Sequence, residues 1–232
     1  MQLTVTDVAR MMDLSAVKTD TDLDAVQQLA DHAKRLDCVC AYVLPGYVTR
    51  LKELLEDTPS VLVGAAVGFP SGAHATAIKA AEARQCVADG AGELDMVINV
   101  GMLRSGQYDF VEQDIRAVID AAEGRLVKVI LETHYLTDDQ IRRGSEICVR
   151  AGADFVKTGT GWPETGATLH NIALIKSVVG DDAKVKASGG VRDLETLVEM
   201  YRLGARRFGV NTESGIRIFG ECASLPDAAV QV

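Results

Sequence analysis

The stretch of sequence that decides the fold reads Leu126-Val127-Lys128-Val129-Ile130-Leu131-Glu132. The side chains of a β-strand alternate between two faces, so this stretch has one apolar face and a second face that includes Lys128 and Glu132. Parallel strands are covered on both faces, and the apolar face belongs against helices. The charges on the second face then need an interior that holds partners for them. A closed barrel, whose strands turn one face inward, provides such an interior.

Three other segments repeat this alternation: Glu93–Asn99, Phe155–Lys157 and Lys184–Ser188. The charged residues that they place opposite an apolar set are Glu93, Asp95, Lys157, Lys184 and Lys186. An unpaired buried charge costs several kcal/mol, so these groups must pair with one another or form a functional site. Their placement alone leaves two interpretations open, a catalytic centre and a structural ion-pair network, because both perturb pKa values.

Apolar, strand-like runs recur about every thirty residues, and each is followed by a helical pattern, as in βαβ units. The predicted strands are Met11–Leu14, Cys38–Val43, Val61–Val67, Leu94–Val100, Leu126–Glu132, Asp154–Thr158, Lys184–Ala187 and Arg207–Val210. A capping box at Thr137 and Gln140 and an N-cap at Asp193 mark two of the helix starts. The repeat fits a closed barrel or an open doubly wound sheet, but no GxGxxG motif follows the first strand. We therefore expect an α/β fold in which residues 1–232 form one domain, a (β/α)8 TIM barrel with a short N-terminal helical extension.

Composition excludes several classes of protein. The 232 residues have a formal net charge of −9, which argues against nucleic acid or an anionic membrane as the main partner. No targeting segment or bilayer-spanning stretch is visible, so we expect a cytoplasmic protein. The five cysteines and four histidines show no zinc-ligand spacing, so we expect no metal.

Two lysines of the predicted inner face suggest a reaction. Lys157 and Lys186 lie late in successive strands, at the barrel end where active sites form, and Asp95 lies in an earlier strand. A second ammonium group and burial both lower the pKa of a lysine, so one of the two is expected to be a neutral amine near neutral pH. A neutral amine attacks aldehydes and ketones to form a Schiff base. The other lysine and the carboxylate can then transfer protons.

Three glycine-rich segments follow the last three predicted strands: Thr158–Gly161, Ser188–Arg192 and Phe208–Thr212. Glycine lets a backbone approach an anion closely, and barrels often bind phosphate with N–H groups of their last loops. Any one of these segments is an ordinary turn. Three in succession at one barrel end indicate a phosphate site.

A set of longer segments, spread over most of the chain, follows one known pattern. They are Met12-Asp13-Leu14-Ser15, Gly68-Phe69-Pro70-Ser71-Gly72, Gly92-Glu93-Leu94-Asp95-Met96-Val97-Ile98-Asn99, Lys128-Val129-Ile130-Leu131-Glu132-Thr133, Ala151-Gly152-Ala153-Asp154-Phe155-Val156-Lys157-Thr158-Gly159-Thr160-Gly161, Val185-Lys186-Ala187-Ser188-Gly189-Gly190-Val191-Arg192 and Phe208-Gly209. Together they resemble the deoxyribose-phosphate aldolase family. The serine pair that this family usually has at the start of the last helix is replaced by Asn211-Thr212, followed by Glu213.

The resemblance implies a lyase that cleaves 2-deoxy-D-ribose 5-phosphate to acetaldehyde and D-glyceraldehyde 3-phosphate, without a metal or other cofactor. It implies that Lys157 forms the Schiff base, that Lys186 lowers the pKa of Lys157, and that Asp95 transfers protons. The residues of the supporting network would be Asp13, Lys128, Glu132 and Thr160. The phosphate would bind to Gly161, Gly189, Gly190, Gly209, Asn211 and Thr212. We expect a homodimer, with the sugar phosphate and acetaldehyde as small-molecule partners.

Three alternatives stay open beside this function. One is a lysine-dependent aldolase with a different, unphosphorylated acceptor aldehyde. Another is a non-catalytic barrel that binds a sugar phosphate, although an idle barrel could replace its buried charges by apolar residues at little cost. The third, a metal-dependent lyase, lacks histidines at ligand spacing. Glu213 has two interpretations as well: its carboxylate competes with phosphate for the positive end of the last helix, or it only caps that helix and points to solvent.

Overall fold

A computed structural model describes residues 1–232, and its centre is a closed barrel of eight parallel strands. The barrel strands are β2 (Met12–Ala16), β3 (Cys40–Val43), β4 (Leu62–Val67), β5 (Glu93–Val97), β6 (Leu126–Ile130), β7 (Phe155–Lys157), β8 (Lys184–Ser188) and β9 (Ala205–Asn211). They neighbour one another in sequence order, and β2 closes the barrel by pairing with β9. The expected (β/α)8 barrel is confirmed.

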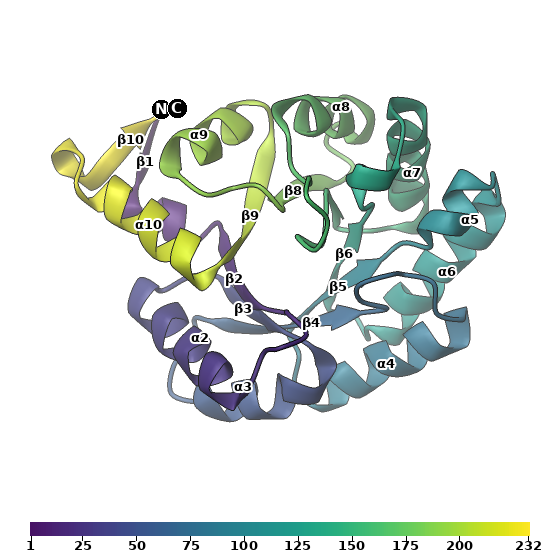
Figure 1. Ribbon diagram of the computed structural model, residues 1–232, viewed down its shortest axis with the longest axis horizontal. Helices are drawn as coiled ribbons and strands as arrows, with labels where there is room; N and C mark the ends of the chain where they lie inside the picture. The colour runs from purple at the N-terminus through teal and green to yellow at the C-terminus, as the bar shows by residue number, and fades with distance from the viewer.

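Helices surround the barrel as an outer ring (Figure 1). They are α1 (Val5–Ala9), α2 (Leu23–Leu36), α3 (Val48–Leu54), α4 (Thr76–Ala88), α5 (Val100–Arg104), α6 (Tyr108–Ala121), α7 (Asp138–Ala151), α8 (Leu169–Val179), α9 (Leu194–Arg202) and α10 (Thr212–Ala223), with short 3₁₀ helices at Pro45–Tyr47, Thr133–Tyr135 and Pro226–Ala228. The short α1 precedes the first barrel strand, as predicted. The capping box at Thr137 and Gln140 and the N-cap at Asp193 are both present.

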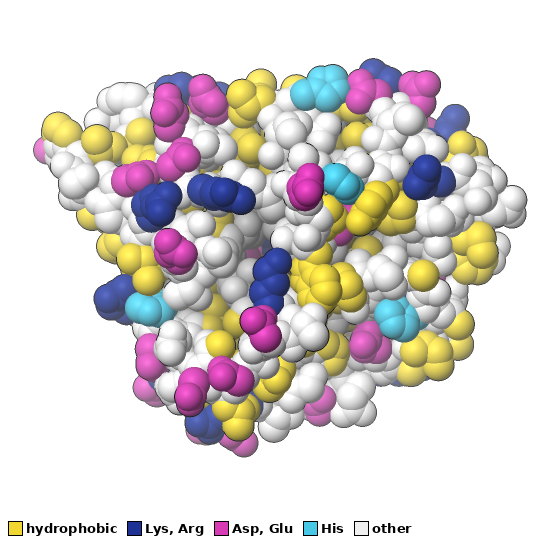
Figure 2. Space-filling model, viewed as in Figure 1, with side chains coloured by type: hydrophobic (Ala, Val, Ile, Leu, Met, Phe, Trp, Pro, Cys, Tyr) yellow, Lys and Arg dark blue, Asp and Glu magenta, His cyan; other side chains and the backbone are white.

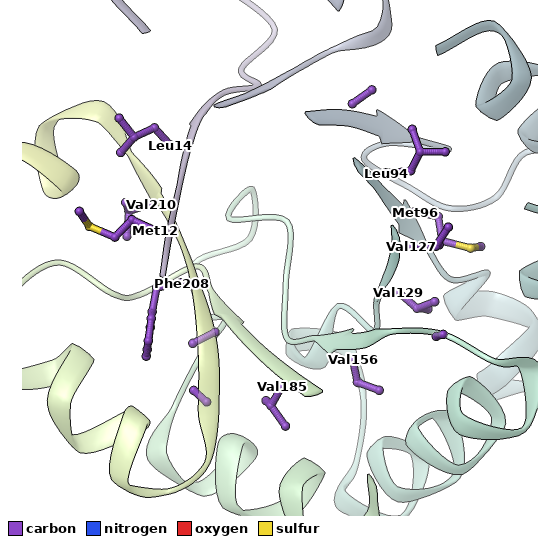
Figure 3. Packing of buried hydrophobic residues seen from close by; sticks show 14 of the residues in the cluster. Met12, Leu14, Leu94, Met96, Val127, Val129, Val156, Val185, Phe208 and Val210 are labelled. Carbon is purple, nitrogen blue, oxygen red and sulfur yellow. The ribbon is translucent and has the colours of Figure 1, made fainter. Parts of the chain in front are cut away.

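The apolar face of each strand points outward, into the layer between the barrel and the helices. Leu94 and Met96 of β5, Val127 and Val129 of β6 and Val156 of β7 are all buried in this layer. Figure 3 shows these side chains on the helix side of their strands. The hydrophobic core of the protein is therefore a ring around the barrel, and the barrel interior is left to polar side chains.

Several predicted boundaries were wrong. The strand expected over Leu94–Val100 ends at Val97, because the Asn99 side chain accepts a hydrogen bond from the Met102 N–H and caps α5. The strand expected over Leu126–Glu132 ends at Ile130, and Glu132 has a positive φ of 55°. Both strands therefore end before the turn that follows them.

A small antiparallel sheet was not predicted. β1 (Gln2–Thr4) pairs with β10 (Ala229–Gln231), so that the two ends of the chain lie side by side (Figure 1). Each strand has only three residues, which leaves little signal in the sequence. Among the helices, none is long and apolar enough to cross a membrane.

Candidate active site

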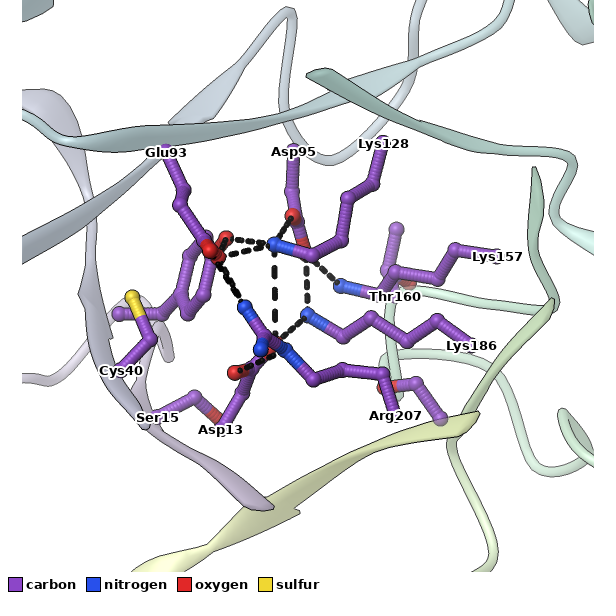
Figure 4. Close-up of polar contacts among 12 residues, drawn as sticks. Asp13, Ser15, Cys40, Glu93, Asp95, Lys128, Lys157, Thr160, Lys186 and Arg207 are labelled. Carbon is purple, nitrogen blue, oxygen red and sulfur yellow. Dashed lines mark hydrogen bonds and ion pairs between the residues drawn. The ribbon is translucent and has the colours of Figure 1, made fainter. Parts of the chain in front are cut away.

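Strand register brings the predicted charged residues together. Lys157 of β7 is paired with Lys186 of β8, and Asp95 of β5 is paired with Lys128 of β6. Because neighbouring residues in a parallel ladder point to the same side, all four side chains enter the barrel interior. Figure 4 shows them converging from separate strands.

Asp95 is the centre of this group. Its Oδ2 atom lies 2.7 Å from Lys157 Nζ and 2.6 Å from Lys186 Nζ, and its Oδ1 atom lies 3.2 Å from Lys128 Nζ. Asp95 is only 1% exposed. Burial by itself would raise the pKa of the Asp95 carboxyl, but the ammonium groups of Lys128, Lys157 and Lys186 outweigh it and hold that pKa well below its usual range.

A second layer of charges lies beneath Asp95 in the barrel. Glu93 pairs with Lys128 Nζ at 2.5 Å and with the guanidinium group of Arg207. Asp13 pairs with Arg207 Nε at 2.9 Å and with Lys186 Nζ at 2.5 Å. Lys186 therefore connects the two layers, and Arg207 holds the acids of the lower one (Figure 4).

The charges inside the barrel balance only when one lysine is neutral. Three carboxylates, Asp13, Glu93 and Asp95, meet four basic groups, which are those of Lys128, Lys157, Lys186 and Arg207. The loss of one proton leaves three negative and three positive charges. A buried site of low dielectric favours the balanced state.

Lys157 is the lysine best placed to lose that proton. The pKa of its amine is lowered from its usual value to about 8. Burial is the largest cause, the Asp95 carboxylate opposes it, and the Lys186 ammonium adds to it. Lys157 contacts one carboxylate, whereas Lys186 contacts two and Lys128 contacts three. The Lys186 ammonium thus lowers the pKa as predicted, but burial is the larger effect.

A narrow cavity opens above these groups. Among its lining residues are the predicted Lys157, Lys186, Asp95, Asp13 and Thr160. Lys128 is fully buried and does not line the cavity. Lys128 therefore reaches the cavity through its contact with Asp95.

Glu132 lies apart from the ion pairs, although the sequence placed it in the same network. Its carboxylate accepts hydrogen bonds from the backbone N–H of Thr160, at 3.1 Å, and from the Thr160 hydroxyl. Strand β6 ends at Ile130, so the strict alternation of faces no longer fixes the direction of the Glu132 side chain. Burial raises the pKa of the Glu132 carboxyl. Glu132 holds the loop after β7 in place.

Five of the six predicted phosphate residues line a second, wider cavity. Gly161, Gly189, Gly190, Gly209 and Asn211 all border it. It shares five lining residues with the first cavity, so the two are continuous. The face drawn in Figure 2 is hollowed near its centre, and basic, acidic and hydrophobic side chains border the hollow.

Thr212 differs from its predicted placement. It does not line the second cavity, whereas Ser214 does. Residues three apart share one side of a helix, so Ser214 lies on the same side of α10 as Asn211, and Thr212 is turned away. The Asn211 Oδ1 atom accepts a hydrogen bond from the Ser214 N–H at 2.8 Å and caps α10. Only the amide NH₂ of Asn211 is left to donate to a ligand.

Two glycines give the cavities their shape. A Cβ atom on Gly209 would lie 2.7 Å from Ser188 Oγ and 3.1 Å from Lys186 Cε, so the absence of a side chain leaves room for Lys186. Gly189 has a φ of 78°, which favours glycine, and its missing side chain lets the loops after β7 and β8 touch. Gly209 therefore leaves room for Lys186, and Gly189 lets the two loops pack closely.

One cluster has the atoms of a metal site. Ligand atoms of Asp13, Cys40 and Glu93 all lie within 4.8 Å of one another. Both carboxylates are already paired with Arg207, and Glu93 also with Lys128. Burial raises the pKa of the Cys40 thiol well above its usual value, so this sulfur stays protonated and is a poor ligand. The donor set does not fit a cation.

With this geometry established, comparison with known proteins identifies the family. A family model described as "DeoC/LacD family aldolase" matches residues 7–215. The chain belongs to this aldolase family. The deoxyribose-phosphate aldolase of Rhizobium meliloti (strain 1021) is 43% identical over 227 residues, which cover 97% of this chain and 91% of the relative. That of Staphylococcus carnosus (strain TM300) is 47% identical over 212 residues, which cover 91% of this chain and 95% of the relative.

Solved structures of family members have the same barrel. The tetrameric deoxyribose phosphate aldolase from Aeropyrum pernix has a TM-score of 0.87 and 28% identity, and the match covers 96% of this chain and 94% of that one. The resemblance inferred from the sequence segments is therefore confirmed over nearly the whole chain.

Sequence reasoning missed several residues of the site of this aldolase. The cavity above Lys157 is also lined by Ser15, Val17, Tyr42, Phe69 and Ser188. The Tyr42 hydroxyl donates a hydrogen bond to Glu93 Oε2 at 3.1 Å, so it also takes part in the lower layer. Cys40 and Tyr42 alternate with Ala41 and Val43, and that alternation was the available signal for an inner face on β3.

Proposed function

We propose that this protein is a deoxyribose-phosphate aldolase in which Lys157 forms a Schiff base with the substrate. The observation that carries the proposal is the contact of the buried Lys157 amine with the same Asp95 oxygen that Lys186 contacts. Burial and the Lys186 ammonium lower the pKa of Lys157 to about 8, against the opposing effect of the Asp95 carboxylate. The shared contact places two proton carriers beside the Lys157 amine. A reactive amine is thus available near neutral pH.

The reaction begins with the open-chain form of 2-deoxy-D-ribose 5-phosphate. The Lys157 amine adds to the C1 aldehyde, and loss of water gives an iminium ion. The bond between C2 and C3 then breaks while the C3 hydroxyl loses its proton, which releases D-glyceraldehyde 3-phosphate. The electron pair of that bond remains as an enamine on Lys157. Protonation at C2 and addition of water release acetaldehyde and restore the amine.

Asp95 and Lys186 transfer the protons of these steps. Asp95 lies 2.7 Å from the nitrogen that forms the imine, within reach of a general acid or base. Lys186 Nζ lies 2.6 Å from Asp95 Oδ2, so these two groups exchange protons during the steps. The sugar chain extends from Lys157 into the second cavity, where the N–H groups of Gly189 and Gly190 and the amide of Asn211 bind the phosphate.

Trapping the imine tests this proposal. The protein is incubated with acetaldehyde, reduced with borohydride and digested for peptide mass analysis. We expect a two-carbon adduct on Lys157, none in the Lys157→Met variant, and an unchanged adduct in the Lys184→Met control. An adduct on Lys186 instead, or none with any small aldehyde, contradicts the proposal. Added chelator should leave the cleavage rate unchanged.

We also propose that residues 1–232 act as one domain in the cytoplasm and that the chain forms a homodimer. All five cysteines are buried free thiols, which suits a reducing compartment. The tetramer reported for the Aeropyrum pernix enzyme makes a tetramer the alternative assembly. Sedimentation equilibrium separates the two, because the mass of the complex differs twofold.

A further inference from the structure

Lys18 lies in a turn whose backbone is well anchored. The Lys18 N–H donates to Thr21 Oγ1 at 3.1 Å, and the Thr21 N–H donates to the Lys18 carbonyl at 3.1 Å. The Tyr47 hydroxyl then donates to the Thr21 carbonyl at 2.7 Å. This turn follows β2 directly, so the start of the Lys18 side chain is fixed at the rim of the barrel.

Two hydrogen bonds join this turn to the loop after β7. Lys18 Nζ donates to the Gly161 carbonyl at 3.1 Å. In the opposite direction, Trp162 Nε1 donates to the Val17 carbonyl at 3.0 Å. Trp162 also packs edge-on against Phe69, with 5.8 Å between the ring centroids. The Lys18 ammonium is thereby held beside the loop that contributes Gly161 to the second cavity.

The charge of Lys18 is not neutralised. Lys18 lines the second cavity, and its ammonium group contacts a neutral carbonyl and no carboxylate. No Asp or Glu lines that cavity, and the other cationic residue in its wall is Arg192. In a chain with a net charge of −9, a cavity whose charged residues are all cationic is prepared for an anion.

We propose that Lys18 is a specificity-determining residue that binds the phosphate group of the sugar substrate. Its ammonium group leaves the Gly161 carbonyl for a phosphate oxygen and adds a charge-assisted hydrogen bond to those of the backbone N–H groups. Because Lys18 lines the second cavity and does not lie beside Lys157, it acts on substrate selection and not on imine formation. This inference rests on the proposed function.

The test compares Lys18→Met, Lys18→Arg and the control Lys184→Met, which removes an exposed lysine from the opposite end of a barrel strand. For 2-deoxyribose 5-phosphate, Lys18→Met should raise KM about fivefold to tenfold and leave kcat within about twofold. For 2-deoxyribose, KM should not change. Inorganic phosphate should inhibit Lys18→Met more weakly by the same factor. Lys18→Arg should restore most of the loss, and Lys184→Met should behave as wild type.

A purely structural role of Lys18 predicts a different result. If Lys18 only ties two loops together, Lys18→Met should change the kinetic constants of both sugars alike. We expect the same pattern for Trp162→Phe, which removes the hydrogen bond to Val17. That result in Lys18→Met, or no change with either sugar, overturns the inference. The imine trap with acetaldehyde needs no phosphate, so its failure in the wild-type protein refutes the proposed function, and its success with unchanged phosphate selectivity in Lys18→Met refutes only the role of Lys18.

Discussion

Lys157 and Lys186 are paired in the register of β7 and β8, and both direct their ammonium groups at one oxygen of Asp95. Two ammonium groups that share one carboxylate oxygen repel each other, and each is stabilised less than a single ammonium group would be. The pair therefore favours loss of a proton from one of the two lysines. Lys186 has a second carboxylate partner in Asp13, and Lys157 has none. The asymmetry of these contacts favours loss of the proton from Lys157, the proposed nucleophile.

Replacing Lys186 should make Lys157 less reactive near neutral pH. In Lys186→Leu, the ammonium that lowers the pKa of Lys157 is gone, and Asp95 then stabilises the Lys157 ammonium alone. Both effects raise the pKa above about 8. The pH at which imine formation with acetaldehyde reaches half of its maximum should therefore rise, while Lys184→Leu leaves it unchanged. An unmoved pH profile in Lys186→Leu would show that the contact is only structural.

Asp95→Asn should separate imine formation from proton transfer. The Asp95 carboxylate raises the pKa of Lys157, so its loss favours the neutral amine and permits the imine. A general acid or base contributes about 10²–10⁴-fold, and exchange of the acetaldehyde methyl protons with deuterium oxide should slow by a factor in that range. Borohydride trapping measures the imine, and NMR measures the exchange. Exchange at the wild-type rate would exclude Asp95 as the proton carrier.

The period of two along a strand was enough to predict the upper layer of the site. Asp95, Lys128, Lys157 and Lys186 each interrupt an apolar alternation, and register then brings them together without any further information from the sequence. Burial of their apolar neighbours against the helices fixes the direction in which they point. These residues could be predicted because strand geometry determines which face of the strand each residue occupies.

The parts of the site outside regular strands could not be predicted in this way. Glu132 has a positive φ after the end of β6, so its side chain does not follow the alternation. Lys18 lies in a turn, and its neighbours Gly161 and Trp162 are more than a hundred residues away in the chain. Arg207 lies on the inner face of β9, but its partners Asp13 and Glu93 are on other strands and come near it only when the barrel closes.

Arg207 should contribute more to stability than any surface arginine. Arg207→Met leaves Glu93 and Asp13 without a guanidinium partner inside the barrel, and breaking a buried ion pair costs about 3–5 kcal/mol. Arg206→Met is the matched control, because Arg206 is exposed and its guanidinium donates to backbone carbonyls. Urea denaturation measures both. A loss of unfolding free energy in Arg207→Met no larger than that in Arg206→Met would contradict the stabilising role of Arg207.

Arg207→Met should also make the fold less stable at acidic pH. The pKa of Glu93 is lowered to about 2: burial would raise it, and the charges of Lys128 and Arg207 outweigh burial. A carboxyl with a lowered pKa stabilises the fold above its ordinary pKa of 4.5, and this contribution is lost as the pH falls toward 2. Without Arg207 the pKa of Glu93 rises, so the loss should begin at a higher pH. Denaturation midpoints between pH 5 and pH 3 measure this shift, and parallel curves for the variant and wild type would contradict it.

Glu213 should have little influence on phosphate selection. A carboxylate in the first turn of α10 competes with phosphate for the positive helix end, an effect of about 0.3–1 kcal/mol, which corresponds to roughly twofold to fivefold in affinity. In the structure, however, the Glu213 side chain is 83% exposed, lies 3.8 Å from Arg217 and does not line the second cavity. Solvent and the arginine both screen its charge.

The ratio of kcat/KM for 2-deoxyribose 5-phosphate to kcat/KM for 2-deoxyribose tests this difference. In Glu213→Gln the ratio should stay within about twofold of wild type, because the carboxylate that is removed is screened from the cavity. In Ser214→Ala the ratio should fall, because the Ser214 hydroxyl borders the cavity and can donate to the phosphate. A clear rise of the ratio in Glu213→Gln would mean that the carboxylate does act on the helix end despite its exposure. A wild-type preference for the free sugar would instead favour an aldolase with an unphosphorylated acceptor.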